Sequence, residues 1–248
     1  MNTYFAGKTA AILGGTGGIG SAVARQLTRA GCKVIAASVD SDEKLDALAQ
    51  ETGADCVHLD VRDRSAVVAL LTPLAPDFLI LAHGALGRTG TLFDQPEESA
   101  QRLVDVNILG VQNCLQAVVP GMIERNDGHI VLLGSVAIYP SLGQPIYSAT
   151  KAAVHSMCRN LRMELYPARV RVTEIRPGRV RSGMHAEMFD GDLAEATRRV
   201  YDPVHCLTAD EIAEGIVWAL NKPAHLCVAE LEIVATEHVI GGVRYKGM

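Results

Sequence analysis

The stretch LGGTGGIGSAV, residues 13–23, decides the fold of this chain. It overlaps the end of the apolar run TAAIL at 9–13 and leads into a segment where Ile19, Val23 and Leu27 fall on one helical face. Glycine permits positive φ angles and a close approach of the backbone to a ligand, and the free N–H groups at a helix start favour a phosphate. A strand, a glycine-rich turn and a helix in this order favour a dinucleotide-binding unit over a tight turn without a ligand.

Short apolar runs rich in β-branched residues recur along the whole chain. They are continuous rather than alternating, as in strands that are buried on both faces of a parallel sheet, and segments with helical spacing separate them. Gly31 and Gly53 are well placed to end the first two helices. With no linker and no internal repeat, the sequence predicts one α/β domain over residues 1–248, a doubly wound Rossmann sheet of seven parallel strands flanked by helices. The predicted strands lie at 9–13, 33–37, 56–59, 78–82, 129–133, 170–175 and 231–234.

The composition narrows the classes of function. The chain has 248 residues, 48% of them hydrophobic, and a formal net charge of −5. No long basic run occurs, which argues against nucleic acid or an anionic membrane as a partner, and no apolar run reaches the roughly 18 residues of a membrane helix. The N-terminus lacks the features of a signal peptide, so we expect a soluble, cytoplasmic protein. The six cysteines and eight histidines are scattered, which favours reduced thiols in the core and no metal.

The end of the second predicted strand bears on the choice of cofactor. Rossmann-type sites usually carry an acidic residue there, which binds the adenosine ribose. Ser38 holds the expected position and Asp40 follows, while neither this bend nor the glycine loop contains Arg or Lys. A 2′-phosphate would therefore meet no cation, and the sequence favours NAD over NADP. An N-cap for the following helix is an equally good interpretation of Asp40.

A second motif, QPIYSATKAAV at 144–154, places Tyr147 four residues before Lys151. Residues four apart lie on the same face of a helix. Ser135 follows the strand at 129–133, twelve residues before Tyr147, and Asn107 lies in VNILG. With these motifs and the glycine loop the chain resembles the short-chain dehydrogenase/reductase family over nearly its whole length.

The resemblance implies an NAD(P)-dependent oxidoreductase that moves a hydride between nicotinamide and a small secondary alcohol or carbonyl compound. Tyr147 would act as acid/base, because a lysine ammonium one turn along should lower the pKa of a phenol from about 10. The family pattern further implies that Lys151 binds the nicotinamide ribose, that Ser135 orients the substrate oxygen, and that Asn107 holds a water of a proton relay. Together Asn107, Ser135, Tyr147 and Lys151 are the predicted catalytic residues.

The resemblance also implies which residues bind the cofactor. The glycine loop, the ends of the second and third strands, the turn after the fourth strand and the P-G-x-V segment would each contribute, beside the catalytic Tyr147 and Lys151. The predicted set is Gly14, Thr16, Gly17, Gly18, Ile19, Gly20, Ser38, Asp40, Asp60, Val61, His83, Gly84, Tyr147, Lys151, Pro177, Gly178 and Val180.

The sequence departs from the family pattern at one turn in particular. Leu81, Ala82, His83 and Gly84 stand where the family usually has Asn-Asn-Ala-Gly, and Leu13 replaces the usual Thr or Ser before the first motif glycine. The hydrogen bonds of the missing asparagines must be rebuilt by other groups. His83 contacts the cofactor in one interpretation and is purely structural in the other.

Specificity should lie in the segment at about 179–207, which we expect to form a lid over the substrate. Arg179 and Arg181 could pair with a carboxylate or sulfonate, or face solvent, and Gln144 is a further candidate substrate contact. Residues 210–236 are similar to the branch that holds serine and 3-hydroxy acid dehydrogenases. The predicted substrate is a small polar or anionic β-hydroxy compound.

Three alternatives stay open from the sequence. The chain could be a non-catalytic nucleotide sensor on the same fold or an NADP-preferring carbonyl reductase. It could also be an epimerase or dehydratase of the extended branch, but those enzymes usually have a separate substrate domain, for which this chain has no room. Ala149, Ala153 and Ser156 form a stripe of small residues. This stripe either packs on the chain's own sheet or, as the resemblance implies, forms a subunit contact in a homotetramer or homodimer.

Overall fold

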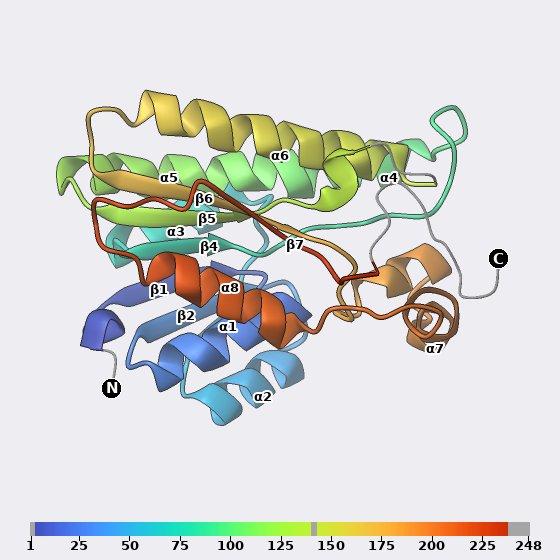
Figure 1. Cartoon of the computed structure of the whole chain (residues 1–248), viewed down its shortest axis with the longest axis horizontal. Helices are drawn as coiled ribbons and strands as arrows, with labels where there is room; N and C mark the ends of the chain where they lie inside the picture. Colours follow the sequence, from blue (N-terminus) through green and yellow to red (C-terminus); the bar gives the residue numbers. More distant parts are fainter. Residues whose placement is uncertain (1–2, 140–142, 238–248) are drawn as a thin grey trace.

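The computed structural model describes residues 3–139 and 143–237, and a seven-stranded sheet forms its centre (Figure 1). The strand order is β3-β2-β1-β4-β5-β6-β7, and every neighbouring pair is parallel. The strands are β1 (Thr9–Leu13), β2 (Lys33–Ser38), β3 (Asp55–His58), β4 (Phe78–Leu81), β5 (Gly128–Leu133), β6 (Val170–Pro177) and β7 (Glu230–Ile233). Each agrees with its predicted run to within two residues at both ends, which confirms the predicted fold class.

Helices cover both faces of the sheet, as Figure 1 shows. One face carries α1 (Gly18–Arg29), α2 (Asp42–Thr52) and α8 (Ala209–Leu220). The other carries α3 (Arg64–Leu74), α4 (Glu97–Val104), α5 (Gly110–Glu124) and α6 (Pro145–Glu164). Side chains of β1 alternate between the two hydrophobic cores: Ala10 and Ile12 belong to the core with α1 and α8, Ala11 and Leu13 to the core with α3, α5 and α6. Burial on both faces explains why the strand sequences are apolar without alternation.

The strand order reverses between β1 and β4, because the chain builds β2 and β3 on one side of β1 and all later strands on the other. Such a switch point opens a crevice at the carboxyl ends of the strands, where α/β proteins bind their ligands. The turns that follow β1, β4, β5 and β6 all meet at this edge. Beyond it lies the predicted lid, which contains η4 (Met184–Phe189), α7 (Leu193–Ala196) and η5 (Thr197–Tyr201) (Figure 1).

One continuous helical run, Glu97–Glu124, crosses the sheet as α4, the π-helical turn η2 (Asp105–Leu109) and α5. By length and composition alone this run could cross a membrane, with a mean hydropathy of 1.3. Its buried residues pack against α3, α6 and the sheet, however, which is the position of a core helix in a folded domain.

Candidate active site

The glycine loop after β1 is closed by hydrogen bonds from the N–H groups of Gly14 and Gly15 to the carbonyl of Ala37, at 2.8 and 3.0 Å. Gly14 has φ 80°, and a Cβ added to it would lie 2.7 Å from the Cα of His83. A Cβ on Gly20 would lie 2.1 Å from the Gly14 carbonyl oxygen. These positions therefore require glycine, and no side chain caps the start of α1 within the described residues. The loop and the uncapped N–H groups of α1 fit the pyrophosphate of a dinucleotide.

The far side of this loop meets the end of β2 through Asp40. Its carboxylate accepts hydrogen bonds from Thr16, from Ser38 at 3.1 Å and from Lys44 at 2.8 Å. Burial acts to raise the pKa of Asp40, but these hydrogen bonds outweigh it, and the pKa lies below its ordinary value. The interpretation of Asp40 as an N-cap is wrong, because Ser41 is the N-cap residue of α2.

The structure corrects the sequence-based expectation about positive charge at this bend. Lys44, one turn into α2, reaches back to Asp40 and places a cation beside the end of β2. The bend itself holds no Arg or Lys, but the Lys44 ammonium lies beside it, with its charge paired with the Asp40 carboxylate. After β3, Asp60 is paired with Arg62 through hydrogen bonds of 2.6–3.0 Å, and Val61 is buried against Gly110.

The four predicted catalytic residues come together at the same edge of the sheet. Lys151 is buried in α6, and its Nζ donates to the carbonyl of Leu133 at 2.7 Å and lies 5.8 Å from the ring centroid of Tyr147. A Cβ added to Gly84 would lie 3.6 Å from Lys151 Nζ and 3.4 Å from Asn107 Oδ1. The turn after β4 thus meets α6 and η2 at one point.

Asn107 is fixed by the π-helical turn that carries it. Its Oδ1 accepts the N–H of Ala85 at 2.8 Å, and its Nδ2 donates to the carbonyl of Ala85 at 2.8 Å and to Thr150 Oγ1 at 3.0 Å. Single π-helical turns often occur at functional sites. Ser135 caps the short helix that follows β5, with its Oγ accepting the N–H of Ala137 at 3.0 Å.

Burial, rather than the neighbouring ammonium, dominates the pKa of Tyr147. Its side chain is 8% exposed, and burial raises its pKa to about 12, opposed by a hydrogen bond with Ser135. The prediction that Lys151 lowers the pKa of this phenol is therefore wrong for the arrangement described here, in which Tyr147 stays protonated at neutral pH. Burial also lowers the pKa of Lys151 to about 8, and the charge of Glu174 opposes that shift.

His83 lies between the glycine loop and Lys151. Both of its ring nitrogens are buried without a hydrogen bond of good geometry to a described residue. Burial, and then the charge of Lys151, lower its pKa to about 3, so the ring is neutral. Its contact with a cofactor stays a prediction, supported by two polar atoms that lack a partner.

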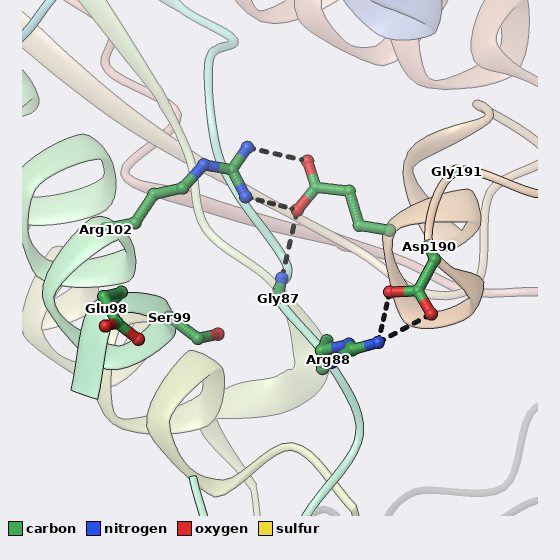
Figure 2. A pocket seen from close by; sticks show the side chains of 8 residues that line it. Gly87, Arg88, Glu98, Ser99, Arg102, Asp190 and Gly191 are labelled. Atoms are coloured by element: carbon green, nitrogen blue, oxygen red, sulfur yellow. Dashed lines mark hydrogen bonds and ion pairs between the residues drawn. The ribbon is translucent and has the colours of Figure 1, made fainter. Parts of the chain in front are cut away.

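The segment predicted to form a lid packs on the hydrophobic cluster that contains Tyr147. Met184 and Met188 are the residues of this segment in that cluster. Glu187, between them in the chain, accepts hydrogen bonds from Arg102 and from the backbone N–H groups of Leu86 and Gly87. Figure 2 shows Arg102 and Gly87. Sequence reasoning did not single out Arg102 or Glu187, because no local motif surrounds either residue and their pairing spans 85 positions.

Other predicted residues of the P-G-x-V segment lie in the lid or where it leaves the sheet. Pro177 ends β6, the N–H of Gly178 donates to Ile233, and Val180 is buried. Arg179 donates to the carbonyl of Val200, and Arg181 is paired with Asp202 at 3.0 Å. Both arginines are thus engaged inside the lid. Gln144 is the N-cap residue of α6, and its buried Nε2 lacks a hydrogen-bond partner among the described residues.

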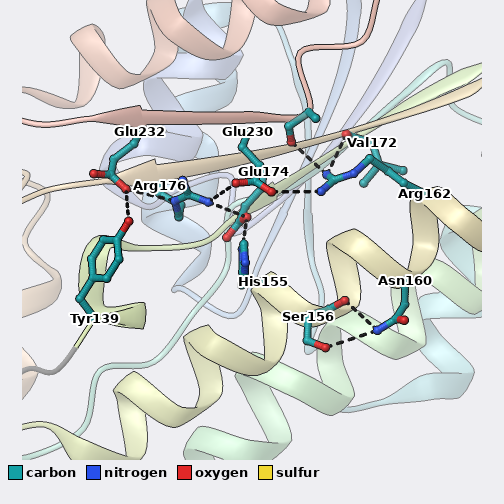
Figure 3. Close-up of polar contacts among 11 residues, drawn as sticks. Tyr139, His155, Ser156, Asn160, Arg162, Val172, Glu174, Arg176, Glu230 and Glu232 are labelled. Carbon is teal, nitrogen blue, oxygen red and sulfur yellow. Dashed lines mark hydrogen bonds and ion pairs between the residues drawn. The ribbon is translucent and has the colours of Figure 1, made fainter.

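A group of charged side chains lies between α6 and the strands β6 and β7 (Figure 3). Glu174 is fully buried and accepts hydrogen bonds from His155 at 2.7 Å and Arg176 at 3.3 Å. Arg176 also pairs with Glu230 and Glu232, at 2.6 and 3.2 Å. The ligand atoms of His155, Glu174 and Glu230 lie within 4.8 Å of one another, but the Arg176 guanidinium already pairs with both of these carboxylates. We therefore interpret the group as an ion-pair network rather than a metal site.

Comparison with known proteins adds independent information. A family model described as short chain dehydrogenase matches residues 8–192. The NADP-dependent 3-hydroxy acid dehydrogenase YdfG of Escherichia coli (strain K12) is 33% identical, over 94% of this chain and 96% of that protein. Dehydrogenase/reductase SDR family member 11 of Gallus gallus is 30% identical, over 94% and 98%. A solved structure described as the closed form of serine dehydrogenase complexed with NADP+ has a TM-score of 0.89 and 32% identity, over 97% of this chain and 100% of that one.

Proposed function

The chain belongs to the short-chain dehydrogenase family and is an NAD(P)-dependent oxidoreductase that acts on hydroxyl and carbonyl groups, and we propose that its substrates are small 3-hydroxy acids. The observation that carries the proposal is the convergence of Lys151 and Asn107 on Gly84, next to the glycine loop, with the ring of Tyr147 5.8 Å from Lys151 Nζ. A sensor without catalysis would need none of these groups, so their convergence supports an enzyme. The substrate class is supported by the relative named as a 3-hydroxy acid dehydrogenase.

The proposed chemistry follows from the protonation states. When bound, the nicotinamide supplies or accepts the hydride. Tyr147 is protonated in the arrangement described, so it is set to donate its proton to a carbonyl oxygen during reduction, and it takes the proton back during alcohol oxidation. Ser135, hydrogen-bonded to Tyr147, would orient the substrate oxygen. Lys151 and Asn107, which both lie beside Gly84, would replace the proton through ordered water, as the family pattern implies.

Replacement of Tyr147 by Phe tests this assignment. The variant removes the proton donor but keeps the ring that packs under Met184 and Met188, so we expect kcat to fall by at least about 100-fold while nucleotide binding is retained. Turnover is measured by nicotinamide absorbance and nucleotide affinity by calorimetry. Turnover equal to that of the natural protein, with nucleotide bound, would refute the role of Tyr147.

For the cofactor we propose a preference for NAD. The support is the carboxylate of Asp40 at the end of β2, where it would accept the ribose 2′-hydroxyl and repel a 2′-phosphate. The relative named as NADP-dependent and the structure described with NADP+ stand against this preference, and Lys44 is the group that could serve a phosphate here.

Two single variants separate these possibilities. Under the proposal, Asp40→Ala raises kcat/KM with NADP about tenfold or more, because it removes a negative charge from the phosphate position. Lys44→Ala should leave kcat/KM with NADP low and nearly unchanged. If the natural protein instead prefers NADP, and Lys44→Ala removes that preference, the proposed role of Asp40 is wrong. Both variants are assayed with NAD and NADP at a fixed substrate concentration.

Assembly into a homotetramer or homodimer and a cytoplasmic location stay predictions. The structure supports the first of them at the stripe of small residues on α6. Ala149 and Ser156 are exposed and Ala153 is half-buried. This exposure argues against packing of the stripe on the chain's own sheet.

A further inference from the structure

We propose that the N–H groups of Leu86 and Gly87 and the guanidinium of Arg102 form the subsite that binds the substrate's carboxylate, and that Glu187 of the lid occupies this subsite when no substrate is present. The inference rests on the proposed function and extends it, since it assigns the group that distinguishes a hydroxy acid from a neutral alcohol.

The donors converge on one carboxylate as they would on a ligand. Glu187 Oε2 accepts the N–H groups of Leu86 and Gly87, each at 3.0 Å, and Arg102 NH1 at 3.1 Å. Glu187 Oε1 accepts Arg102 NH2 at 3.2 Å. A guanidinium that binds both oxygens, together with two backbone N–H groups, is a typical geometry for recognition of a carboxylate.

Gly87 permits this arrangement through its backbone. Its φ is 73°, in the left-handed region, and a Cβ there would lie 3.2 Å from Leu103 Cδ1. The turn after β4 therefore directs two successive N–H groups to the same oxygen, at a position that favours glycine.

The subsite borders the catalytic tyrosine. Leu86 belongs to the buried cluster that contains Tyr147, and so does Leu103, the neighbour of Arg102 in the chain. The charge of Glu187 acts to raise the pKa of Tyr147, as expected of a carboxylate close to the phenol. An open hollow of about 390 Å³ adjoins the subsite, and its lining includes Gly87, Arg102 and Glu187 (Figure 2). The hollow gives a small acid access to the donors, and the shared cluster of Leu86, Leu103 and Tyr147 places these donors beside the phenol.

The two sides of this contact belong to different parts of the molecule. All three donors lie on the body of the domain, in the turn after β4 and in α4, whereas Glu187 lies in η4 of the lid. When the lid lifts, the donors lose their partner and attract another anion. A substrate carboxylate would therefore compete with Glu187 for the same donors.

A second ion pair between body and lid provides a matched control. Arg88 pairs with Asp190 at 2.5 Å, and the side chain of Arg88 does not bind Glu187, although Arg88 follows Gly87 directly in the chain (Figure 2). If Arg102 served only to hold the lid down, its loss and the loss of Arg88 would act alike. If Arg102 binds the substrate carboxylate, replacement of Arg102 lowers kcat/KM more for a charged than for a neutral substrate, whereas replacement of Arg88 affects both substrates equally.

The experiment compares 3-hydroxybutanoate with its methyl ester, a neutral alcohol of nearly the same shape, in the full-length protein. We expect Arg102→Met to lower kcat/KM for the acid about 10- to 100-fold and for the ester less than about threefold. Arg88→Met should change both values by the same factor. Glu187→Gln, which keeps the shape and removes the charge, should lower KM for the acid about fivefold and leave KM for the ester within about twofold.

Equal losses on acid and ester in Arg102→Met would overturn the proposal and leave Arg102 as a lid contact. An unchanged or higher KM for the acid in Glu187→Gln would show that Glu187 does not compete with substrate, and would also overturn it. Failure of the proposed function looks different, because the natural protein would then turn over neither compound with NAD or NADP. In that case the binding of malonate is measured by calorimetry in the natural protein and in Arg102→Met. Binding that is lost in Arg102→Met supports the carboxylate subsite, and equal binding in both overturns it.

Discussion

Tyr147 and Lys151 lie one turn apart in α6, and the pKa of each is moved against its charged form by burial. The spacing of the motif suggested that the ammonium would lower the pKa of the phenol. The structure shows why it does not: Lys151 Nζ is directed to the carbonyl of Leu133, and the predicted lid packs on the cluster that contains the phenol. A charge can lower the pKa of a neighbouring group only where removal from water does not outweigh it.

The buried ammonium of Lys151 should cost the protein stability. The fall of its pKa from an ordinary 10.5 to about 8 corresponds to about 3 kcal/mol below pH 8, where both folded and unfolded chains are protonated. Replacement of Lys151 would remove this cost but would also lose the hydrogen bond to the Leu133 carbonyl, which lowers the stability by about 1 kcal/mol. We therefore expect Lys151→Met to be inactive yet more stable than the natural protein by about 1–2 kcal/mol at pH 7.

The sign of the pH dependence follows from the lowered pKa. Between pH 8 and 10.5 the folded chain releases this proton before the unfolded chain does, so the natural protein gains stability relative to Lys151→Met as the pH rises. Urea unfolding at pH 7 and pH 10 measures the difference. Lys33→Met, at an exposed lysine, is the control and should change stability by less than about 0.5 kcal/mol at either pH. A Lys151→Met variant less stable than the natural protein at pH 7 would contradict this expectation.

Sequence reasoning could identify the residues that share a motif, but not those that meet across the fold. Tyr147, Lys151 and Ser135 follow from fixed spacings along the chain. Lys44 stands four positions after Asp40, so that pairing could have been predicted from local spacing. Arg102 could not, because its partner Glu187 lies 85 positions away in the chain. Flexible side chains of this kind leave no periodic signal in the sequence.

At the scale of elements, the end of β5 is tightly coupled to β6 by Gly134. A Cβ on Gly134 would lie 2.4 Å from Oε1 of the fully buried Glu174, so the carboxylate would have to move away from His155 and Arg176. The next residue is Ser135, so the same displacement would reach the active site.

We expect Gly134→Ala to destabilise the protein by about 1–3 kcal/mol, as overpacking of a core does, and to lower kcat as well. Addition of Glu174→Asp, which shortens the side chain by one methylene, should recover part of the stability. Gly121→Ala in α5 is the control, because its Cβ would lie 3.5 Å from Arg125 NH1, an ordinary contact. Thermal unfolding of these variants beside the natural protein tests this, and a stable, fully active Gly134→Ala would contradict it.

The elements themselves were largely predictable, because buried parallel strands and glycine-terminated helices have strong local signals. Gly53 ends α2 with φ 74°, as the sequence predicted. The π-helical turn at Asn107 and the short helices of the lid were not predicted, since neither has a sequence period that differs clearly from an α-helix or a loop.

For the whole molecule, the alternation of strands and helices was enough to predict a doubly wound sheet, because right-handed crossovers leave few arrangements. It was not enough to show that the predicted lid packs on the cluster of Tyr147. Met184 and Met188 contact this cluster about 40 positions after Tyr147, and Glu187 binds Gly87 across 100 positions. The sequence also could not show that the stripe of small residues on α6 is accessible, because this depends on which face of α6 packs against the sheet.

The helical run that carries both Arg102 and Asn107 has a consequence for how this protein can change. The two residues stand five positions apart, one before and one within the π-helical turn. Each residue added to a helix rotates the residues after it by about 100° and advances them by about 1.5 Å. An insertion or deletion between Arg102 and Asn107 would turn one side chain away from its partners, whichever end stayed in place. The number of residues between Arg102 and Asn107 is therefore fixed by their partners: the segment can accept substitutions, but we expect an insertion or deletion to break one set of contacts.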